Sequence, residues 1–320
     1  MSDRQLVRYS NLVWDSARWE GFELRPGDIV IATPPKCGTT WTQMICALLI
    51  FQTPTFDQPL SKISPWIDML TRPRGDVIAE LDAQQHRRFI KTHTPLDGLP
   101  WSDEVTYINV GRDPRDVAVS MAHHMSNMDY EKFLGALAAT ASADGGEWQP
   151  ARPGGGAGAV AADAAPPAPP TDLDVFWEWV DNPIAPTEAT SSLLRTLTHH
   201  ETFWSQRSSP NVVLLHYDEL QADLDGQMRA LADRLAITAP GDRWPSLVEA
   251  ATFEKMRGNA GTLAPNTDVA IWQSNTEFFH RGTSGQWRTL LDDEAQHRYR
   301  ARVEQLGVDP DLRAWIHHEA

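Results

Sequence analysis

Four short apolar segments recur along the chain, and each ends in a polar residue that can take part in chemistry. They are residues 28–33, 88–93, 105–112 and 211–217. Short apolar runs separated by helical patterns predict a mostly parallel sheet. Ligands bind at the carboxyl ends of the strands in such sheets, so we expect the terminal polar residues to form one site. The predicted fold is a single α/β domain with a central, mostly parallel β-sheet flanked by helices.

Helical patterns follow the first and the third of these segments. After the first, apolar side chains recur with the spacing of one buried helix face, and Thr39 or Thr40 is the expected N-cap. After the third, Asp113 can cap a helix that has Pro114 at its first position and Asp116 at its third. The apolar positions of the first helix are Trp41, Ile45, Leu48 and Leu49.

Composition and charge narrow the class of protein. Of the 320 residues, 41% are apolar and 22% are charged, which is typical of a soluble globular protein. A net charge of −15 argues against a nucleic-acid-binding protein, although a few cations at one water-poor site can still bind an anion. Residues 1–21 have no signal-peptide pattern, and the apolar run at 45–51 is too short to span a bilayer. We expect a cytoplasmic protein.

The two cysteines, Cys37 and Cys46, form neither a disulfide framework nor a metal-ligand pattern, so no metal is expected. The composition changes between residues 138 and 171, where the chain is rich in Gly, Ala and Pro and has few apolar anchors. We interpret this stretch as a flexible insertion in a single domain of residues 1–320. It is either a solvated loop or a lid over the site.

The loop before the first helix carries residues suited to a phosphate. A helix N-terminus presents free N–H groups and the positive end of its dipole. Lys36 adds a charge, Gly38 allows close approach of the backbone, and Trp41 offers a flat face for a purine. The Gly-Lys-Ser/Thr order of ATP-binding loops is missing. The loop alone fits an ordinary turn with an incidental lysine equally well.

Arg112 and Ser120 make a second candidate phosphate site. Arg112 ends the third strand, and Ser120 lies two turns into the helix that follows. A guanidinium binds a phosphate through paired hydrogen bonds, but Arg112 could instead pair with Asp113 or Asp116. Arg115 is expected to be solvated.

Two more segments carry candidate chemistry. Arg281, Gly282 and Gly285 offer a cation and accessible amides, which together predict an anion nest. His93 ends the second strand beside Lys91, and a histidine is the natural general base near neutral pH. A structural role is the alternative for any one of the eleven histidines.

Five motifs occur in the order and rough spacing seen in the cytosolic-type sulfotransferases. They are PPKCGTTW, FIKTHTPLDGLP, VGRDPRDVAVS, VVLLHYDEL and RGTSGQW. The chain therefore resembles enzymes that use 3′-phosphoadenosine 5′-phosphosulfate (PAPS), and the likeness runs from about residue 29 to residue 288. It implies in-line transfer of a sulfuryl group to a hydroxyl or amine of a small-molecule acceptor, with 3′-phosphoadenosine 5′-phosphate (PAP) as product.

The resemblance also implies a role for each matching residue. Catalysis would rest on His93 as general base, Lys91 beside it, and Lys36 at the leaving phosphate oxygen. The 5′-phosphate side would be held by Lys36, Cys37, Gly38, Thr39 and Thr40. The 3′-phosphate would be held by Arg112, Ser120, Arg281 and Gly282. The adenine side would contact Trp41, Tyr217, Thr252, Phe253 and Met256.

The acceptor side is expected near three residues, and the resemblance supplies only the first of them. Trp66 lies in a segment similar to one that borders the acceptor pocket, and His123 and His124 are fallback bases that can face it. Further aromatic candidates for the pocket wall are Phe176, Trp177 and Trp179.

The sequence departs from the family pattern at several places. Cys37 replaces the usual serine, Ala251 a threonine, and His280 the first of two basic residues. The segment after Arg288 lacks the Thr-Val pair of the dimerisation motif, so a homodimer is left open. Two alternatives remain: a nucleotide kinase of the phosphate-loop class, and a PAPS- or PAP-binding protein without turnover.

Overall fold

The computed structural model describes residues 5–146, 170–267 and 269–319. The described residues form a four-stranded parallel sheet in the order β2-β1-β3-β4. The strands are β1 (Ile29–Ala32), β2 (Phe89–Thr92), β3 (Thr106–Gly111) and β4 (Val212–His216). Each lies inside one of the four predicted segments, so the expected α/β fold with a parallel sheet is confirmed.

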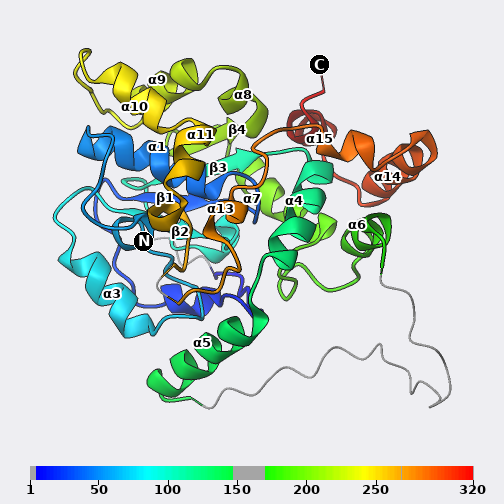
Figure 1. Ribbon diagram of the computed structural model, residues 1–320, viewed down its shortest axis with the longest axis horizontal. Coiled ribbons are helices and arrows are strands. Elements are labelled where there is room, and N and C mark those ends of the chain that lie inside the picture. The colour runs from blue at the N-terminus through cyan, green and yellow to red at the C-terminus, as the bar shows by residue number, and fades with distance from the viewer. Residues whose placement is uncertain (1–4, 147–169, 268, 320) are drawn as a thin grey trace.

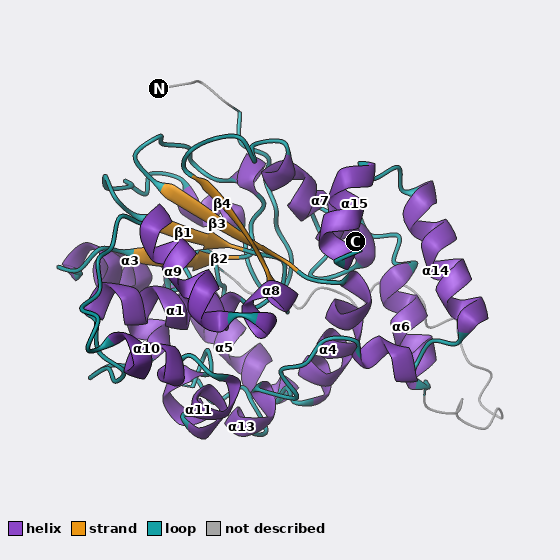
Figure 2. Cartoon of the chain, turned by 90° about the horizontal axis from the view of Figure 1, so that it is seen from above, coloured by secondary structure: helices purple, strands orange, loops and turns teal. Residues whose placement is uncertain are grey.

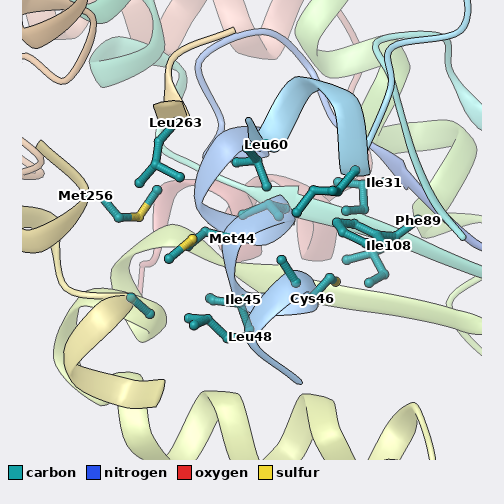
Figure 3. Packing of buried hydrophobic residues seen from close by; sticks show 14 of the residues in the cluster. Ile31, Met44, Ile45, Cys46, Leu48, Leu60, Phe89, Ile108, Met256 and Leu263 are labelled. Atoms are coloured by element: carbon teal, nitrogen blue, oxygen red, sulfur yellow. The ribbon is translucent and has the colours of Figure 1, made fainter. Parts of the chain in front are cut away.

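Both faces of the sheet are covered by helices, as Figures 1 and 2 show. Ile29 and Ile31 of β1 pack against buried side chains of α1 on one face of the sheet. Val30 packs on the other face, in a cluster that includes Phe203 of α7 (Leu193–Trp204). This alternation follows from the two-residue period of a strand. Figure 3 shows Ile31 beside Phe89 and Ile108, in the same cluster as Ile45 and Leu48 of α1 (Thr39–Phe51). Of the predicted apolar stripe of α1, Ile45, Leu48 and Leu49 are buried and Trp41 is partly buried.

Most of the remaining helices form two groups around the sheet (Figure 1). The helices near α1 are α2 (Leu60–Ile63), α8 (Tyr217–Ala222), α9 (Leu224–Arg234), α10 (Trp244–Ala250), α11 (Phe253–Gly258), α12 (Ala260–Leu263) and α13 (Asn275–Phe278). On the other side lie α4 (Pro114–Ser126), α6 (Asp172–Val180), α14 (Asp293–Gln305) and α15 (Pro310–His317). Helix α3 (Arg74–Ala83) packs through Val77 and Leu81 into the cluster that contains Phe203. Short 3₁₀ helices are η1 (Ser16–Trp19), η2 (Leu96–Gly98) and η3 (Gln286–Thr289).

The two predicted helix starts differ in outcome. The Asp113 side chain caps α4 by accepting a bond from the Arg115 amide, and Pro114 is the first helical residue, as predicted. The N-cap of α1 is Gly38 rather than Thr39 or Thr40, and no side chain caps this end. Gly38 takes the left-handed conformation, with φ of 95°, which leaves the first amides of α1 without a side-chain acceptor.

The first residues of the predicted insertion are helical. Residues 138–143 complete α5 (Tyr130–Ala143), and α6 begins at Asp172 with a capping box built by Thr171 and Asp174. Alanine-rich sequence is compatible with a helix, which the compositional argument for flexibility missed. Residues 147–169 lie outside the described residues.

Candidate active site

One cavity of about 590 Å³ opens where the loops after β1, β2 and β3 meet. The further aromatic candidates Phe176, Trp177 and Trp179 do not line it, whereas all but one of the residues expected to act as nucleotide ligands, bases or acceptor contacts do. These lining residues are Lys36, Gly38, Thr39, Thr40, Trp41, Trp66, Lys91, His93, Arg112, Ser120, His123, His124, Tyr217, Thr252, Phe253, Met256, Arg281 and Gly282. Segments from residue 36 to residue 282 therefore converge on one space.

Cys37 is the exception. Its side chain is fully buried and packs with Val117 of α4, on the side of the loop away from the cavity. Burial raises the pKa of the Cys37 thiol to about 12. The Cys37 side chain therefore does not line the cavity, because the loop turns the thiol into the core.

The cavity has a charge opposite to that of the protein as a whole. Lys36, Lys91, Arg112 and Arg281 line it, together with four histidines. Glu254 is the one carboxylate among the described lining residues. A protein with a net charge of −15 has thus gathered cations around one partly enclosed volume. Such a volume favours an anion, because charges interact more strongly where water is excluded.

Lys36 stands at the head of the phosphate-binding loop in a left-handed backbone conformation, with φ of 69°. Its Nζ lies 3.3 Å from Nδ1 of His124 and 4.8 Å from the ring centre of Phe278. Burial, reinforced by the Arg112 guanidinium, lowers the pKa of Lys36 to about 7. No carboxylate neutralises this ammonium in the bonds described, so its natural partner is an anionic ligand.

The backbone of the same loop is held close to Tyr217. A Cβ added at Gly38 would lie 3.1 Å from Cδ2 of Tyr217, and the φ of 95° already favours glycine. Thr39 Oγ1 lies 2.6 Å from Thr33 Oγ1, which ties the helix start to the end of β1. The Trp41 indole donates to the Ala251 carbonyl at 2.8 Å and meets the Tyr217 ring edge-on at 5.3 Å.

Arg112 is buried and bonds to carbonyl oxygens rather than to carboxylates. Its guanidinium donates to the Lys36 carbonyl at 2.7 Å and to the Thr283 carbonyl at 3.4 Å, and it lies 4.2 Å from the Tyr217 ring centre. Arg112 Nε is buried without a hydrogen-bond partner. An unsatisfied buried donor is costly, so this atom marks a position where a ligand oxygen would be stabilised.

The two aspartates that could have paired with Arg112 have other partners. Asp113 forms an ion pair with Arg115 at 2.7 Å, and the Arg115 guanidinium lies 3.7 Å from the Trp287 ring centre. The expectation that Arg115 is solvated is therefore wrong. Its side chain is buried because Asp113 neutralises it and Trp287 covers it.

Asp116 organises the glycine-containing turn near residue 285. Its carboxylate accepts the amides of Gly285 at 2.7 Å and Gln286 at 2.8 Å. These amides thus already bind an anion of the protein itself, which corrects the prediction of a nest open to a ligand at Gly285. The part of the turn that faces the cavity is Arg281–Gly282, where a Cβ on Gly282 would collide with the Phe253 ring at 2.2 Å.

His93 is placed as a neutral base. Its Nδ1 lies 2.7 Å from the Thr33 carbonyl oxygen, which can only accept, so Nδ1 carries the proton and Nε2 keeps its lone pair. The ring packs between Trp14 at 5.5 Å and Trp66 at 4.7 Å. Burial, with the Lys91 ammonium nearby, holds the pKa of His93 well below its usual value.

A buried aspartate that the sequence analysis missed supports this base. Asp68 accepts hydrogen bonds from Trp66 Nε1 at 2.5 Å and Thr94 Oγ1 at 2.6 Å, and from Thr92 and Trp19. The Trp66 ring packs edge-on against the His93 ring, and Lys91 Nζ lies 4.0 Å from the Trp66 ring centre. The sequence does contain a signal for Asp68, which is the one acidic residue in the otherwise apolar segment 66–70. An acidic residue in such a segment indicates a buried carboxylate that needs several hydrogen-bond donors.

The other acceptor-side residues line the cavity near α13. The ring centres of His124 and Trp272 lie 4.7 Å apart with the rings tilted by 56°, and the ring centres of His123 and His280 lie 3.5 Å apart. The aromatic residues of α6 do not reach this wall. Phe176, Trp177 and Trp179 belong to the cluster formed with α14 and α15 instead, because their helix packs on the far side of α4.

Comparisons with known proteins agree with this geometry. The family described as the sulfotransferase domain matches residues 26–307. A glycolipid sulfotransferase of Mycobacterium tuberculosis (strain ATCC 25177 / H37Ra) is 42% identical over 325 residues, covering 99% of this chain and 95% of that protein. Human sulfotransferase 1E1 is 23% identical over 318 residues, covering 96% and 93%.

Solved structures share the fold at lower identity. A mouse sulfotransferase complexed with PAP has a TM-score of 0.66 at 17% identity, covering 94% of this chain and 92% of that one. Retinol dehydratase in complex with androsterone and PAP has a TM-score of 0.65 at 22% identity, covering 91% and 83%. Separately, none of the helices in the described residues has the length and apolar character needed to cross a membrane.

Proposed function

The chain belongs to the sulfotransferase family, and from that premise we propose that it transfers a sulfuryl group from PAPS to a hydroxyl of a glycolipid. One observation carries the proposal: Lys36, Arg112 and Arg281, from distant segments, line a single cavity. The 42% identical relatives, named glycolipid sulfotransferases, support a lipid-linked sugar as acceptor. An amine at the same position is the alternative acceptor group.

The cavity residues fit a nucleotide with two separate phosphate groups. Lys36 and the free amides at the start of α1 would hold the 5′-phosphate, a role suited to a helix N-terminus. Arg112, Ser120 and Arg281 would hold the 3′-phosphate, with the unpartnered Arg112 Nε as one donor. PAPS, when bound, supplies the sulfuryl group and a phosphate as leaving group. The aromatic walls for the adenine are Trp41, Tyr217 and Phe253.

His93 would act as the general base. Its Nε2 lone pair takes the proton of the acceptor hydroxyl, while the Thr33 carbonyl holds the ring in the required tautomer. Because the pKa of His93 is well below its usual value, the ring is neutral at pH 7 and ready to accept a proton. A positioned base of this kind contributes about 10²- to 10⁴-fold to the rate.

Lys36 would stabilise the charge that grows on the leaving phosphate oxygen. Transfer of a planar group between two oxygens needs mostly positioning and charge compensation from the protein. Lys91 lies over the Trp66 ring that packs on the base, and its charge contributes to the lowered pKa of His93. No step of this scheme requires a metal.

The proposed site needs residues from one chain only. All the residues assigned above come from the same cavity, so a homodimer is proposed only as an assembly and not as a requirement for catalysis. Both cysteines are free and buried, which suits a proposed location in the reducing cytoplasm. Residues 1–320 are proposed to act as one sulfotransferase domain.

The direct test is incubation with labelled PAPS and a panel of acceptors, read by mass spectrometry. The panel contains glycolipids, sterols, phenols and free sugars. Sulfated glycolipid is the expected product. Nucleotide binding with no sulfated product from any acceptor would instead support a binding protein without turnover.

A second measurement separates this function from a nucleotide kinase. PAP should raise the melting temperature more than ATP with Mg²⁺, because the loop lacks the Gly-Lys-Ser/Thr order and the cavity holds cations for two separate phosphates. A larger shift with ATP and Mg²⁺ would favour the kinase.

A further inference from the structure

Exposed apolar side chains gather at the mouth of the cavity. Three of the large apolar residues that are strongly exposed in the described chain also line the cavity: Leu12, Met125 and Tyr130, with exposed fractions of 42%, 36% and 49%. Leu134, exposed at 38%, lies one helical turn after Tyr130 on α5. We call these four residues the apolar collar.

Helix α5 continues the collar away from the cavity. Its residues 133–143 contain no charged side chain, although Leu134, Gly135 and Ala139 face solvent. The opposite face is buried through Phe133, which also lines the cavity, and Leu137. Figure 1 shows α5 projecting from the body of the protein. One helix therefore joins the cavity wall to an exposed apolar surface.

A second peripheral helix shows how unusual this surface is. Helix α14 also lies at the edge of the molecule, and six of its thirteen residues are charged. A helix that is exposed to water normally carries such charges on its outer face. An uncharged, exposed apolar surface that is continuous with a binding cavity is typical of a contact with an apolar partner.

We infer that the apolar collar and the exposed face of α5 contact the hydrocarbon of a lipid bilayer, so that a lipid-linked acceptor enters the cavity from the membrane. The inference rests on the proposed function for its acceptor. Phe133 and Met128 line the same cavity as His93, so the collar and the base belong to one continuous space. The sugar would reach the base while the acyl chains stay on the collar.

The charges around the collar define the kind of bilayer. Lys132, the one basic residue of α5, is held in an ion pair with Asp129 at 3.0 Å. The protein as a whole carries a charge of −15. Anionic lipids would repel it, so the contact depends on apolar burial and favours a zwitterionic surface.

The test uses Leu134→Glu, with Leu173→Glu on α6 as matched control. Leu134 belongs to the collar but does not line the cavity, and Leu173 is exposed at 36% away from it. The rates are measured on a glycosyl diacylglycerol in phosphatidylcholine vesicles and on the deacylated glycosyl glycerol in solution. Leu134→Glu should lower the ratio of the first rate to the second about tenfold, since it puts a charge where the proposal buries apolar surface. The control should leave the ratio unchanged.

Vesicle flotation gives a readout that does not need turnover. The wild-type protein should float with phosphatidylcholine vesicles, less with vesicles that contain anionic lipid, and Leu134→Glu should remain in solution. Flotation that Leu134→Glu abolishes supports the collar even without sulfated product, which would count against the proposed function alone. Absence of flotation, or equal loss of both rates, would overturn the inference. So would a wild-type dimer that Leu134→Glu converts to a monomer, because a second copy would then cover the collar.

Discussion

The His93 Nδ1 lies 2.7 Å from the Thr33 carbonyl oxygen, at the point where the chain leaves β1 for the phosphate-binding loop. The same short segment therefore orients the base and begins the loop that carries Lys36. The bond holds the proton on Nδ1 and leaves Nε2 free to accept one. Since Thr33 is fully buried and its neighbours pair with β2, the ring has little freedom to turn away.

Replacing the base should separate catalysis from nucleotide binding. His93→Ala should lower kcat by about 10²- to 10⁴-fold, because among the described residues lining the cavity only His93 has its Nδ1 bonded to a backbone carbonyl, which leaves Nε2 as the acceptor. PAP affinity measured by calorimetry should stay within about threefold. His297→Ala, an exposed histidine on α14, is the control. A large loss of PAP affinity in His93→Ala would make the residue a nucleotide ligand instead.

Lys36 should matter more for turnover than for folding. Lys36→Ala removes the cation proposed to face the leaving phosphate, and loss of one such stabilising group typically costs about 10²- to 10³-fold in kcat. The melting temperature should change little, because the side chain is buried without a carboxylate partner and its loss relieves a desolvation cost. The control is Lys62→Ala, whose partner Glu80 keeps its ion pair with Arg72. Unchanged turnover in Lys36→Ala would remove the lysine from the mechanism.

Binding of PAP should take up protons near pH 8. Burial lowers the pKa values of Lys36 and Lys91 to about 7, so both amines are mostly neutral at pH 8 in the free protein. A bound anion favours the protonated form and raises these values, so affinity should rise as the pH falls from about 9 to 7.

Calorimetry in two buffers with different ionisation enthalpies measures this uptake. Lys36→Met should reduce the number of protons taken up, and proton release on binding would contradict the assignment.

The pH profile of kcat should report the protonation of His93. Activity should persist below pH 6.5 until His93 gains a proton, because its pKa is well below the usual value.

Asp68 should prove to be a positioning residue. Asp68→Asn weakens the bonds that hold Trp66 against His93, so kcat should fall about tenfold while PAP affinity is kept. The free energy of unfolding should fall by about 1–3 kcal/mol, as expected when a buried acceptor is lost. The matched control is Asp103→Asn, which also accepts from an indole, Trp101 Nε1, but on the surface. Equal effects of both variants on kcat would leave Asp68 with a merely structural role.

The sequence predicted the sheet well because its evidence was local. Each strand is a short apolar run with a polar residue at or just after its end, and the parallel order brings those ends together. The start of α4 was predicted equally well, because its signal is local too. Asp113 accepts a hydrogen bond from an amide of the first turn, and Pro114 at the first position has no amide that needs a partner. Convergence of Lys36 and Arg112 follows from the topology, with β1 and β3 as neighbours.

What the sequence did not reveal depends on contacts between distant segments. Arg115 is buried because Trp287, over 170 positions away, covers it, and local charge patterns carry no trace of that contact. Asp116 was read as a helix-end charge, yet its partners are the amides of residues 285 and 286. Cys37 lies next to the nucleotide loop in sequence but points into the core, because the left-handed residues 36 and 38 reverse the chain around it.

The central claim is that one nucleotide bridges Lys36, Arg112 and Arg281, and a crystal structure of the complex with PAP tests it most directly. The account predicts the 5′-phosphate at Lys36 and the first amides of α1, the 3′-phosphate within hydrogen-bond distance of Arg112 Nε, and His93 Nε2 facing the space beyond the 5′-phosphate. PAP bound elsewhere, or with its 3′-phosphate in solvent and Arg112 Nε still unpartnered, would contradict it.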